Sequence, residues 1–274
     1  LPIPGGRKSV CVVIDSDGKD TPDPAIKPRA THKGMTPAEL AAIVREAGIC
    51  GMGGAAYPTN SKILSTAGKT DTMIINACEC EPYITSDDMV MCTWPEKVIL
   101  GARILADVIG AKHTVIAVED NKPEAIEALR SKLGGNEDIE GRAPPTRYPQ
   151  GAKKQIILAV TGREVAPGAR TGALFNVTTV YSICRAVYEG LPITEKVVTV
   201  TGEGAVEPKN MIVRVGTPIG ELLEAAGGVK EETCKVICGG PMMGTAQGDL
   251  SVPVVKGTNA VLCMVDAAPA AEDP

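Results

Sequence analysis

The sequence predicts an α/β protein in which a Rossmann-like parallel sheet is followed by a small β-grasp-like domain. Apolar segments at 71–76 and 113–118 have the length of buried strands. Each is followed by a longer segment with helical periodicity, at 86–109 and 121–133. A strand–helix–strand–helix order is typical of a parallel sheet. From 197–201 onward the pattern changes to short, β-branched strands with a single helix among them, which indicates a second and smaller domain.

The N-terminal part of the chain predicts little regular structure. Within residues 1–33, only 9–14 has the β-branched composition of a strand, and prolines then mark an extended linker. Thr36 begins the first helix, because Pro37 occupies its first position and Glu39 completes a capping box. We therefore expect regular structure to start at this cap.

Changes in composition set the expected domain limits. Residues 1–33 are the remnant of an N-terminal domain and a linker, and 34–194 form the α/β domain. The β-grasp-like domain covers 195–250, and 251–274 supply a return strand and a disordered tail.

Composition excludes several classes of function. The 274 residues carry a net charge of −5 and only 3% aromatic side chains, which argues against nucleic acid as the main partner. No apolar run is long enough for a membrane span. The nine cysteines include spacings such as Cys78 to Cys80 and Cys234 to Cys238, which form neither a Cys-x-x-Cys motif nor an iron–sulfur ladder. We expect reduced thiols in a cytosolic protein, and no metal site in this chain.

The stretch at 48–62 is the first candidate for ligand binding. Four of its glycines fall within seven residues, and Pro58, Thr59 and Lys62 follow. Closely spaced glycines let backbone N–H groups approach a ligand, and the start of a helix attracts an anion. The stretch is therefore a candidate phosphate cradle, although it lacks the P-loop and dinucleotide fingerprints. The alternative is a glycine-rich connection without a ligand.

A second candidate follows the strand at 71–76. Ligands of parallel sheets bind beyond the carboxyl ends of the strands, where this chain carries Glu79, Glu81, Asp87 and Asp88. These acids are consistent with a divalent-metal site, with an acid–base pair or with ribose binding. For the two aspartates we favour capping of the helix that they begin. The two glutamates precede that cap and need another explanation.

A third segment, 148–155, opens a helix with a glycine and two lysines. It is either a second anion site or, taken alone, a solvated basic helix end. A phosphate cradle at 51–62 with carboxylates at 79–81 would together make a nucleotide or flavin site.

Four segments, 51–62, 76–85, 148–155 and 196–228, together resemble the RnfC family, whose members are subunits of the Rnf electron-transport complex. The resemblance covers most of 36–264, and the flavin-carrying subunit of respiratory complex I is a more distant relative. It implies non-covalent FMN, which takes a hydride from NADH and passes electrons singly to iron–sulfur clusters. It also implies that the second domain is a soluble-ligand-binding (SLBB) β-grasp domain.

The resemblance assigns roles to individual residues. It implies no catalytic side chain, because the flavin carries the chemistry, and no metal ligand. The positions that match NADH contacts, or lie where such contacts are usual, are Tyr57, Glu81 and Lys153. The positions that match FMN contacts are Gly51, Gly53, Gly54, Lys62, Asn76, Glu79, Tyr148, Gly151, Asn176 and Thr179.

The resemblance also implies a cellular setting. The chain would be an electron-entry oxidoreductase subunit of an ion-translocating complex, on the cytoplasmic face of the membrane, held there by partner subunits. It looks like a core fragment: the barrel-sandwich domain would finish near residues 15–20, and a ferredoxin-like domain with 4Fe–4S clusters would follow 261–264. Related flavoproteins serve cobalamin or proline reduction, and a flavin-free scaffold is the alternative from a different class.

Three departures from the family pattern bear on the donor. Met52 stands where the complex I relatives have an arginine, and Cys78 where they have an aspartate. Ala152 and Lys153 occupy positions where acidic side chains are usual. We therefore expect weaker NADH binding or an altered preference among hydride donors, while the flavin contacts are retained.

Overall fold

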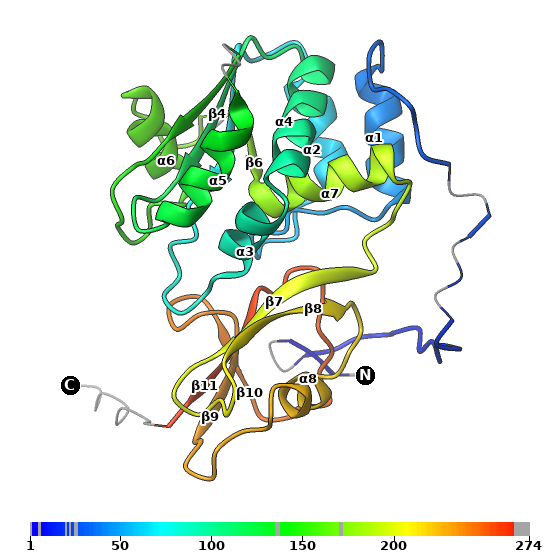
Figure 1. The fold of residues 1–274 in the computed structure, drawn as a ribbon, viewed down its shortest axis with the longest axis vertical. Helices are drawn as coiled ribbons and strands as arrows, with labels where there is room; N and C mark the ends of the chain where they lie inside the picture. The colour runs from blue at the N-terminus through cyan, green and yellow to red at the C-terminus, as the bar shows by residue number, and fades with distance from the viewer. Residues whose placement is uncertain are drawn as a thin grey trace. The chain divides into compact units, whose positions relative to one another are not determined.

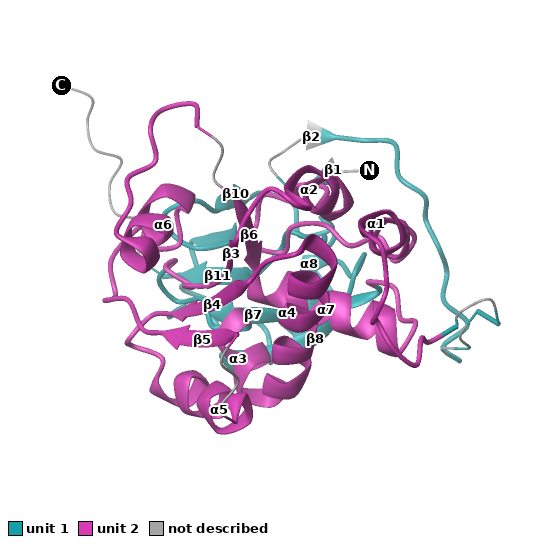
Figure 2. Cartoon of the chain, turned by 90° about the horizontal axis from the view of Figure 1, so that it is seen from above, with its two compact units in different colours: residues 1–27, 82–86, 194–274 teal, residues 28–81, 87–193 magenta. Residues whose placement is uncertain are grey.

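The structure is a computed structural model, and it describes residues 2–4, 7–19, 21, 23–24, 27–134, 138–169 and 172–265. The tail predicted to be disordered lies, apart from Val265, outside the described residues, as does Pro22 of the predicted linker. The chain divides into two compact units, which Figure 2 colours separately. One unit comprises residues 28–81 and 87–193, and the other comprises 1–27, 82–86 and 194–274.

The unit formed by 28–81 and 87–193 contains a four-stranded parallel sheet in the order β5-β4-β3-β6. Its strands are β3 (Thr72–Ala77), β4 (His113–Val118), β5 (Ile139–Arg142) and β6 (Ala173–Asn176). The buried strands β3 and β4 occupy the centre, which confirms the predicted parallel α/β domain. The short edge strands β5 and β6 were not predicted.

Helices cover both faces of this sheet. In Figure 1, α6 lies on one face, and α4 and α7 lie on the other. On the α6 face, Ile156 and Val160 pack against Ile74, Val115 and Leu174 of the strands. The helices of this unit are α1 (Pro37–Glu46), α2 (Thr59–Thr66), α3 (Ser86–Thr93), α4 (Pro95–Ile109), α5 (Pro123–Leu133), α6 (Lys153–Thr161) and α7 (Val177–Tyr188).

The start of α1 follows directly from the sequence. The Thr36 hydroxyl accepts a hydrogen bond from the Glu39 backbone amide at 3.3 Å, and the Glu39 carboxylate accepts from the Thr36 amide at 2.8 Å. This is the predicted capping box. Gly48, with φ of +67°, follows the helix and turns the chain into the glycine stretch.

The other unit contains a five-stranded mixed sheet in the order β10-β9-β11-β7-β8. The central strand β11 runs parallel to β7 and antiparallel to β9, and α8 supplies Leu222 and Leu223 to the core beneath the sheet. This mixed sheet with one helix confirms the predicted fold class. Its elements are β7 (Glu195–Thr201), β8 (Lys209–Arg214), α8 (Ile219–Ala225), β9 (Lys235–Cys238), β10 (Thr245–Gln247) and β11 (Ala260–Met264).

The strand predicted at 9–14 is wrong. Two short strands, β1 (Pro2–Ile3) and β2 (Arg7–Lys8), pair with each other, and the segment after them has no regular structure. Val10 is 100% exposed and Ile14 is 82% exposed. β-branched residues favour a strand only where a neighbouring strand and a buried face are present, and this segment has neither here.

Two expectations from composition can be compared with the described residues. All nine cysteines are free thiols. Within the described ranges, no helix combines the length and the apolar character that crossing a bilayer requires.

Candidate functional site

The glycine stretch forms a closed loop between α1 and α2. The Gly51 amide donates to the Tyr57 carbonyl at 2.8 Å, and the Ala56 amide donates back to the Gly51 carbonyl at 3.1 Å. Gly54 has φ of +95°, a conformation that side chains rarely adopt, and the space where its Cβ would lie is open. The loop therefore presents glycine backbone to open space, as a ligand cradle requires.

Thr179 holds this loop against α7. Its hydroxyl accepts a hydrogen bond from the Met52 amide at 2.9 Å and lies 3.5 Å from the Cys50 carbonyl. Met52 itself is only 1% exposed, so its side chain contributes packing. Thr179, a predicted site residue, thus holds the loop in place.

Lys62 extends from α2 to the edge strand β6. Its Nζ donates to the Leu174 carbonyl at 2.9 Å and lies 5.7 Å from the Tyr57 ring centroid and 5.3 Å from that of Phe175. Burial and, to a smaller extent, the charge of Lys153 lower the pKa of Lys62 to about 8. Lys62 and Lys153 therefore lie close enough for their charges to interact, although they are far apart in sequence.

The loop after β3 and the loop before α6 touch each other. The Asn76 amide group donates to the Gly151 carbonyl at 2.9 Å, and its oxygen accepts from the Cys78 backbone amide at 3.1 Å. A Cβ on Gly151 would lie 2.6 Å from the Cys78 carbonyl oxygen, which is too close. Glycine at 151 is thus required by the contact between two segments that the sequence predicted to share a site.

Asn176 caps α7 and borders the glycine loop. Its side-chain oxygen accepts from the Thr179 amide at 3.2 Å, and its nitrogen donates to the Asp87 carboxylate at 2.7 Å. A Cβ on Gly53 would lie 3.4 Å from the same nitrogen. Asn176 and Gly53 are therefore neighbours.

Glu79 gives the acidic cluster a role that the sequence did not predict. Its carboxylate accepts from the Asp87 amide at 2.8 Å and from the Asp88 amide at 3.3 Å, at the start of α3. The prediction that the two aspartates cap this helix is wrong. Their backbone amides donate to the Glu79 carboxylate, so Glu79 is the capping residue. The Asp87 carboxylate instead accepts from Asn176 and, at 2.5 Å, from the Thr178 hydroxyl.

Burial governs the titration of Glu79. Burial is the largest influence and raises the pKa of Glu79 to about 7, with the Asp87 charge acting in the same direction. Lys122 partly offsets this rise, since its Nζ lies 3.7 Å from Glu79 and 3.5 Å from Asp88. In this structure the Glu79 carboxylate therefore serves as a helix cap. Its contact with a flavin stays a prediction.

Of the remaining predicted residues, Tyr57, Tyr148 and Lys153 are exposed and Glu81 is half-buried. Tyr57 is 51% exposed and Tyr148 is 44% exposed. Burial, followed by the charge of Glu81, raises the pKa of Tyr148, so Glu81 lies close to the Tyr148 loop. Lys153 is the first residue of α6, whose cap residue Ala152 makes no side-chain hydrogen bond.

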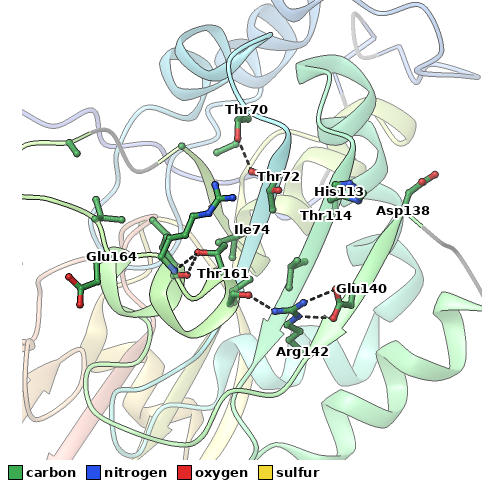
Figure 3. Close-up of a pocket in the computed structure, with 18 of the residues that line it drawn as sticks. Thr70, Thr72, Ile74, His113, Thr114, Asp138, Glu140, Arg142, Thr161 and Glu164 are labelled. Carbon is green, nitrogen blue, oxygen red and sulfur yellow. Dashed lines mark hydrogen bonds and ion pairs between the residues drawn. The ribbon is translucent and has the colours of Figure 1, made fainter.

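A cavity of about 750 Å³ lies elsewhere in the same unit (Figure 3). Its lining includes Thr72, His113 and Thr114 at the amino ends of the strands, and Arg142 near Glu140. The predicted site residues all belong to the described part of the chain, and none of them lines this cavity. Since ligands of parallel sheets bind at the carboxyl ends, we place the candidate site at the Asn76–Gly151 contact rather than in this cavity.

Sequence reasoning missed one buried acid at this edge. Glu119 follows β4 directly and is 1% exposed. Burial above all raises the pKa of both Cys78 and Cys80, and the charge of Glu119 acts in the same direction. The sequence contained a signal for Glu119: it comes directly after a buried strand, which places it at the same edge of the sheet as Asn76.

The parallel-sheet unit with its glycine loop, lysines and polar strand ends defines an α/β ligand-binding domain joined to a mixed-sheet domain. The Nuo51 FMN-binding domain family matches residues 44–185, and the SLBB domain family matches 197–246. This chain therefore belongs to the family of the Nuo51 FMN-binding domain.

Curated relatives extend the comparison over nearly the whole chain. A subunit of the Na(+)-translocating ferredoxin:NAD(+) oxidoreductase complex of Acetobacterium woodii is 40% identical over 268 residues, which are 96% of this chain and 60% of the relative. A subunit of the ion-translocating oxidoreductase complex of Erwinia tasmaniensis is 43% identical over 98% of this chain and 33% of the relative. The chain thus spans about three fifths and one third of these relatives. They confirm the resemblance to the RnfC family.

Solved structures support the fold. A chain of the NAD+-reducing NiFe hydrogenase in the air-oxidized state matches with a TM-score of 0.68 and 20% identity, over 83% of this chain and 46% of that chain. The H2-reduced state of the hydrogenase gives a TM-score of 0.65 and 21% identity, over 84% and 47%. Both likenesses concern the fold alone.

Proposed function

We propose that this chain binds FMN at the carboxyl edge of its parallel sheet and receives a hydride there from NADH, as the electron-entry part of an Rnf-type complex. The observation that carries the proposal is the meeting of the loop after β3 with the loop before α6 at the Asn76–Gly151 hydrogen bond of 2.9 Å. When bound, FMN accepts a hydride and releases electrons singly. The match of 44–185 to an FMN-binding domain family supports this cofactor.

Positive charge suits the phosphate of FMN. The ammonium of Lys62 donates to a backbone carbonyl, so its charge is not neutralised by that partner. Lys153 and Lys154 begin α6, whose first turn holds no acidic residue. Lysines at the positive end of a helix are unfavourable for the helix itself, so an anion bound nearby would relieve their repulsion.

The polar residues around the glycine loop fit a positioning role. Thr179 fixes the loop on α7, Asn176 caps α7 by accepting from the Thr179 amide, and Asn76 fixes the loop at Gly151. Residues held by several hydrogen bonds keep a binding surface in one geometry, which lowers the entropy lost when a ligand binds. The exposed Tyr57 ring offers a surface for stacking, and we assign it with Glu81 and Lys153 to the NADH side of the site.

Partners follow from the relatives. Two of them are named as subunits of ion-translocating oxidoreductase complexes, and one of these names includes ferredoxin and NAD+. We propose that this chain assembles with other subunits of such a complex, that these hold it at the cytoplasmic face of the membrane, and that electrons leave through 4Fe–4S clusters in a ferredoxin-like domain.

Reconstitution tests the proposal. The purified chain is incubated with FMN, freed of unbound flavin, and its absorbance is followed without oxygen while NADH is added. We expect a protein-bound flavin spectrum that NADH bleaches. Absence of FMN binding by the folded chain would contradict the proposal and favour the flavin-free scaffold. Binding without bleaching would retain the flavin site and exclude NADH as its donor.

A further inference from the structure

Glu119 occupies a position that the proposed function does not yet use. It follows β4 directly, and the pairing of Ala77 with Val118 places it beside Cys78 at the carboxyl edge of the sheet. Val115 and Ala117 pack on the α6 face, so the alternation along the strand directs Glu119 to that face as well. The charge effect of Glu119 on Cys78 agrees with this placement.

The Glu119 carboxyl group is buried without a partner. The residue is 1% exposed, and neither of its carboxyl oxygens has a hydrogen-bond partner among the described residues. Burial is the largest influence on this group and raises its pKa, while the nearby Arg147 amide and the Lys122 charge act in the opposite direction. Burial shifts the titration of a carboxyl group toward higher pH, and a carboxyl group buried without a hydrogen bond calls for an explanation.

The surroundings of Glu119 connect it with the candidate site. The Cys78 and Cys80 thiols face it from the loop after β3, and burial above all raises the pKa of both. From the loop before α6 comes the Arg147 backbone amide, and a Cβ on Gly151 would lie 3.4 Å from the Cys80 sulfur. Glu119 thus lies next to both of the loops that meet at the candidate site.

The other charged groups around Glu119 do not neutralise it. Asp120 raises its pKa and Lys122 lowers it, both from its own end of β4. The ammonium of Lys122 forms its ion pairs with Glu79 and Asp88. A further negative charge near Glu119, or the loss of water around it, would therefore shift Glu119 toward its protonated form.

We propose that Glu119 is a positioning residue of the flavin site, whose carboxyl group takes up one proton from solvent when anionic FMN binds, so that no uncompensated negative charge remains beside the contact between the loop at Arg147–Gly151 and the loop at Cys78–Cys80. The proposal rests on the proposed FMN site. The step is the protonation of one carboxylate, with no change of oxidation state. FMN brings negative charge and excludes water, and both favour the neutral carboxyl group.

Proton uptake separates this role from a merely structural one. A buried acid that only fills space would alter stability, but it would not change the number of protons taken up on binding. FMN binding to the full chain is measured by calorimetry near pH 7 in two buffers that differ in ionisation enthalpy, which gives the number of protons taken up. The titration of the FMN phosphate, of Lys62 and of Glu79 is common to all variants and is removed by comparing them.

The variants give definite expectations. Glu119→Gln keeps the shape and removes the titration, so we expect up to about one proton fewer than in the unaltered chain. Glu119→Asp retains a carboxyl group and is expected to restore much of the uptake. Glu127→Gln, an exposed residue of α5, is the matched control and should behave like the unaltered chain.

The outcomes separate the role of Glu119 from the existence of the FMN site. Equal proton uptake by the unaltered chain and by folded Glu119→Gln would overturn the role of Glu119 and leave the FMN site intact. Absence of FMN binding by the unaltered chain would overturn the FMN site itself. If Glu119→Gln does not fold, Glu119→Asp decides: its shorter carboxyl group must change the pH dependence of FMN affinity, and an unchanged profile would contradict the proposal.

Discussion

At the scale of single residues, Lys62 is the side chain on which flavin binding should depend most. Its ammonium donates to a carbonyl and carries a pKa lowered by burial to about 8. Lys62→Ala removes a charge-assisted hydrogen bond to the FMN phosphate, worth roughly 1.5–3 kcal/mol or about tenfold to a hundredfold in affinity. We expect FMN to be weakened more than NADH, measured by calorimetric titration of each.

The pH dependence gives a second readout for Lys62. Since its pKa without ligand is about 8, FMN affinity should be full below that pH and fall as the pH rises above it. Lys62→Ala should lose this fall. Lys69→Ala, an exposed lysine just after α2, is the control and should leave both affinities unchanged. A larger loss for NADH than for FMN would mean that the two roles are exchanged.

Lys153 decides the preference for the donor. It begins α6, where a carboxylate would be favourable toward the helix dipole, and its charge lowers the pKa of Lys62. We expect Lys153→Glu to tighten NADH binding, because the side chain then matches the acidic residue usual in the family. Lys154→Glu changes the same charge one position further along and should have the smaller effect. Unchanged NADH affinity in Lys153→Glu would show that this side chain points away from the site.

The sequence predicts part of the site because each segment carries residues of a recognisable type, and the family resemblance assigns these segments to one ligand. Gly151 and Asn76 were expected near one ligand, and their side chain and backbone meet. The use of the Glu79 carboxylate as a cap was not predicted, because the chain between Glu79 and Asp87 must fold back to bring them together. The place of Glu119 after β4 could be read from the sequence, but its burial could not, because its neighbours come from the loops at Cys78 and Arg147.

At the scale of elements, the stability that the cap residue Glu79 gives to α3 depends on pH. The folded-state pKa of Glu79 is about 7 against an ordinary value of 4.5, so the folded chain keeps a proton that the unfolded chain has released. This contribution to stability is full below about pH 4.5 and is lost as the pH rises through 7. The shift corresponds to a loss on the order of 3 kcal/mol.

Denaturant unfolding measures this dependence. Between about pH 5 and about pH 8, Glu79→Gln should lose less stability than the unaltered chain, since it cannot titrate while its amide oxygen still accepts from α3. Glu46→Gln, an exposed residue at the end of α1, should keep the original slope. An identical slope in Glu79→Gln would mean that another group titrates.

Elements differ in how well their sequence determines them. The capping box at Thr36 and Glu39 fixes α1 locally, and the apolar runs of β3 and β4 have the length of buried strands. By contrast, β5 has one buried residue in four, and so carries no alternating pattern. β6 has three buried residues, and only Asn176, the cap of α7, separates this short apolar run from that of the helix. Such short edge strands are specified by their neighbours in the sheet.

At the scale of the whole molecule, the chain passes between its two units within the candidate region. Residues 82–86 belong to the unit with the mixed sheet, whereas Glu81 and Asp87 belong to the other. The Asn210 amide group donates to the Thr85 hydroxyl at 3.0 Å, and the Thr199 hydroxyl accepts from the Thr85 amide at 3.1 Å. Two strands of the mixed sheet therefore fix the geometry of this segment.

Asn210→Ala tests this anchoring. It removes the partner of Thr85 and also the acceptor of the Thr199 hydroxyl, a bond of 2.7 Å, so two polar groups lose about 1–3 kcal/mol of hydrogen bonding. We expect faster amide hydrogen exchange across 82–86, read by mass spectrometry, because local opening there costs less free energy. Lys209→Ala, whose exposed ion pair with Glu207 contributes little, is the control on the same strand. Equal exchange in both variants would mean that the chain connections at Glu81 and Asp87, rather than the mixed sheet, hold the segment in place.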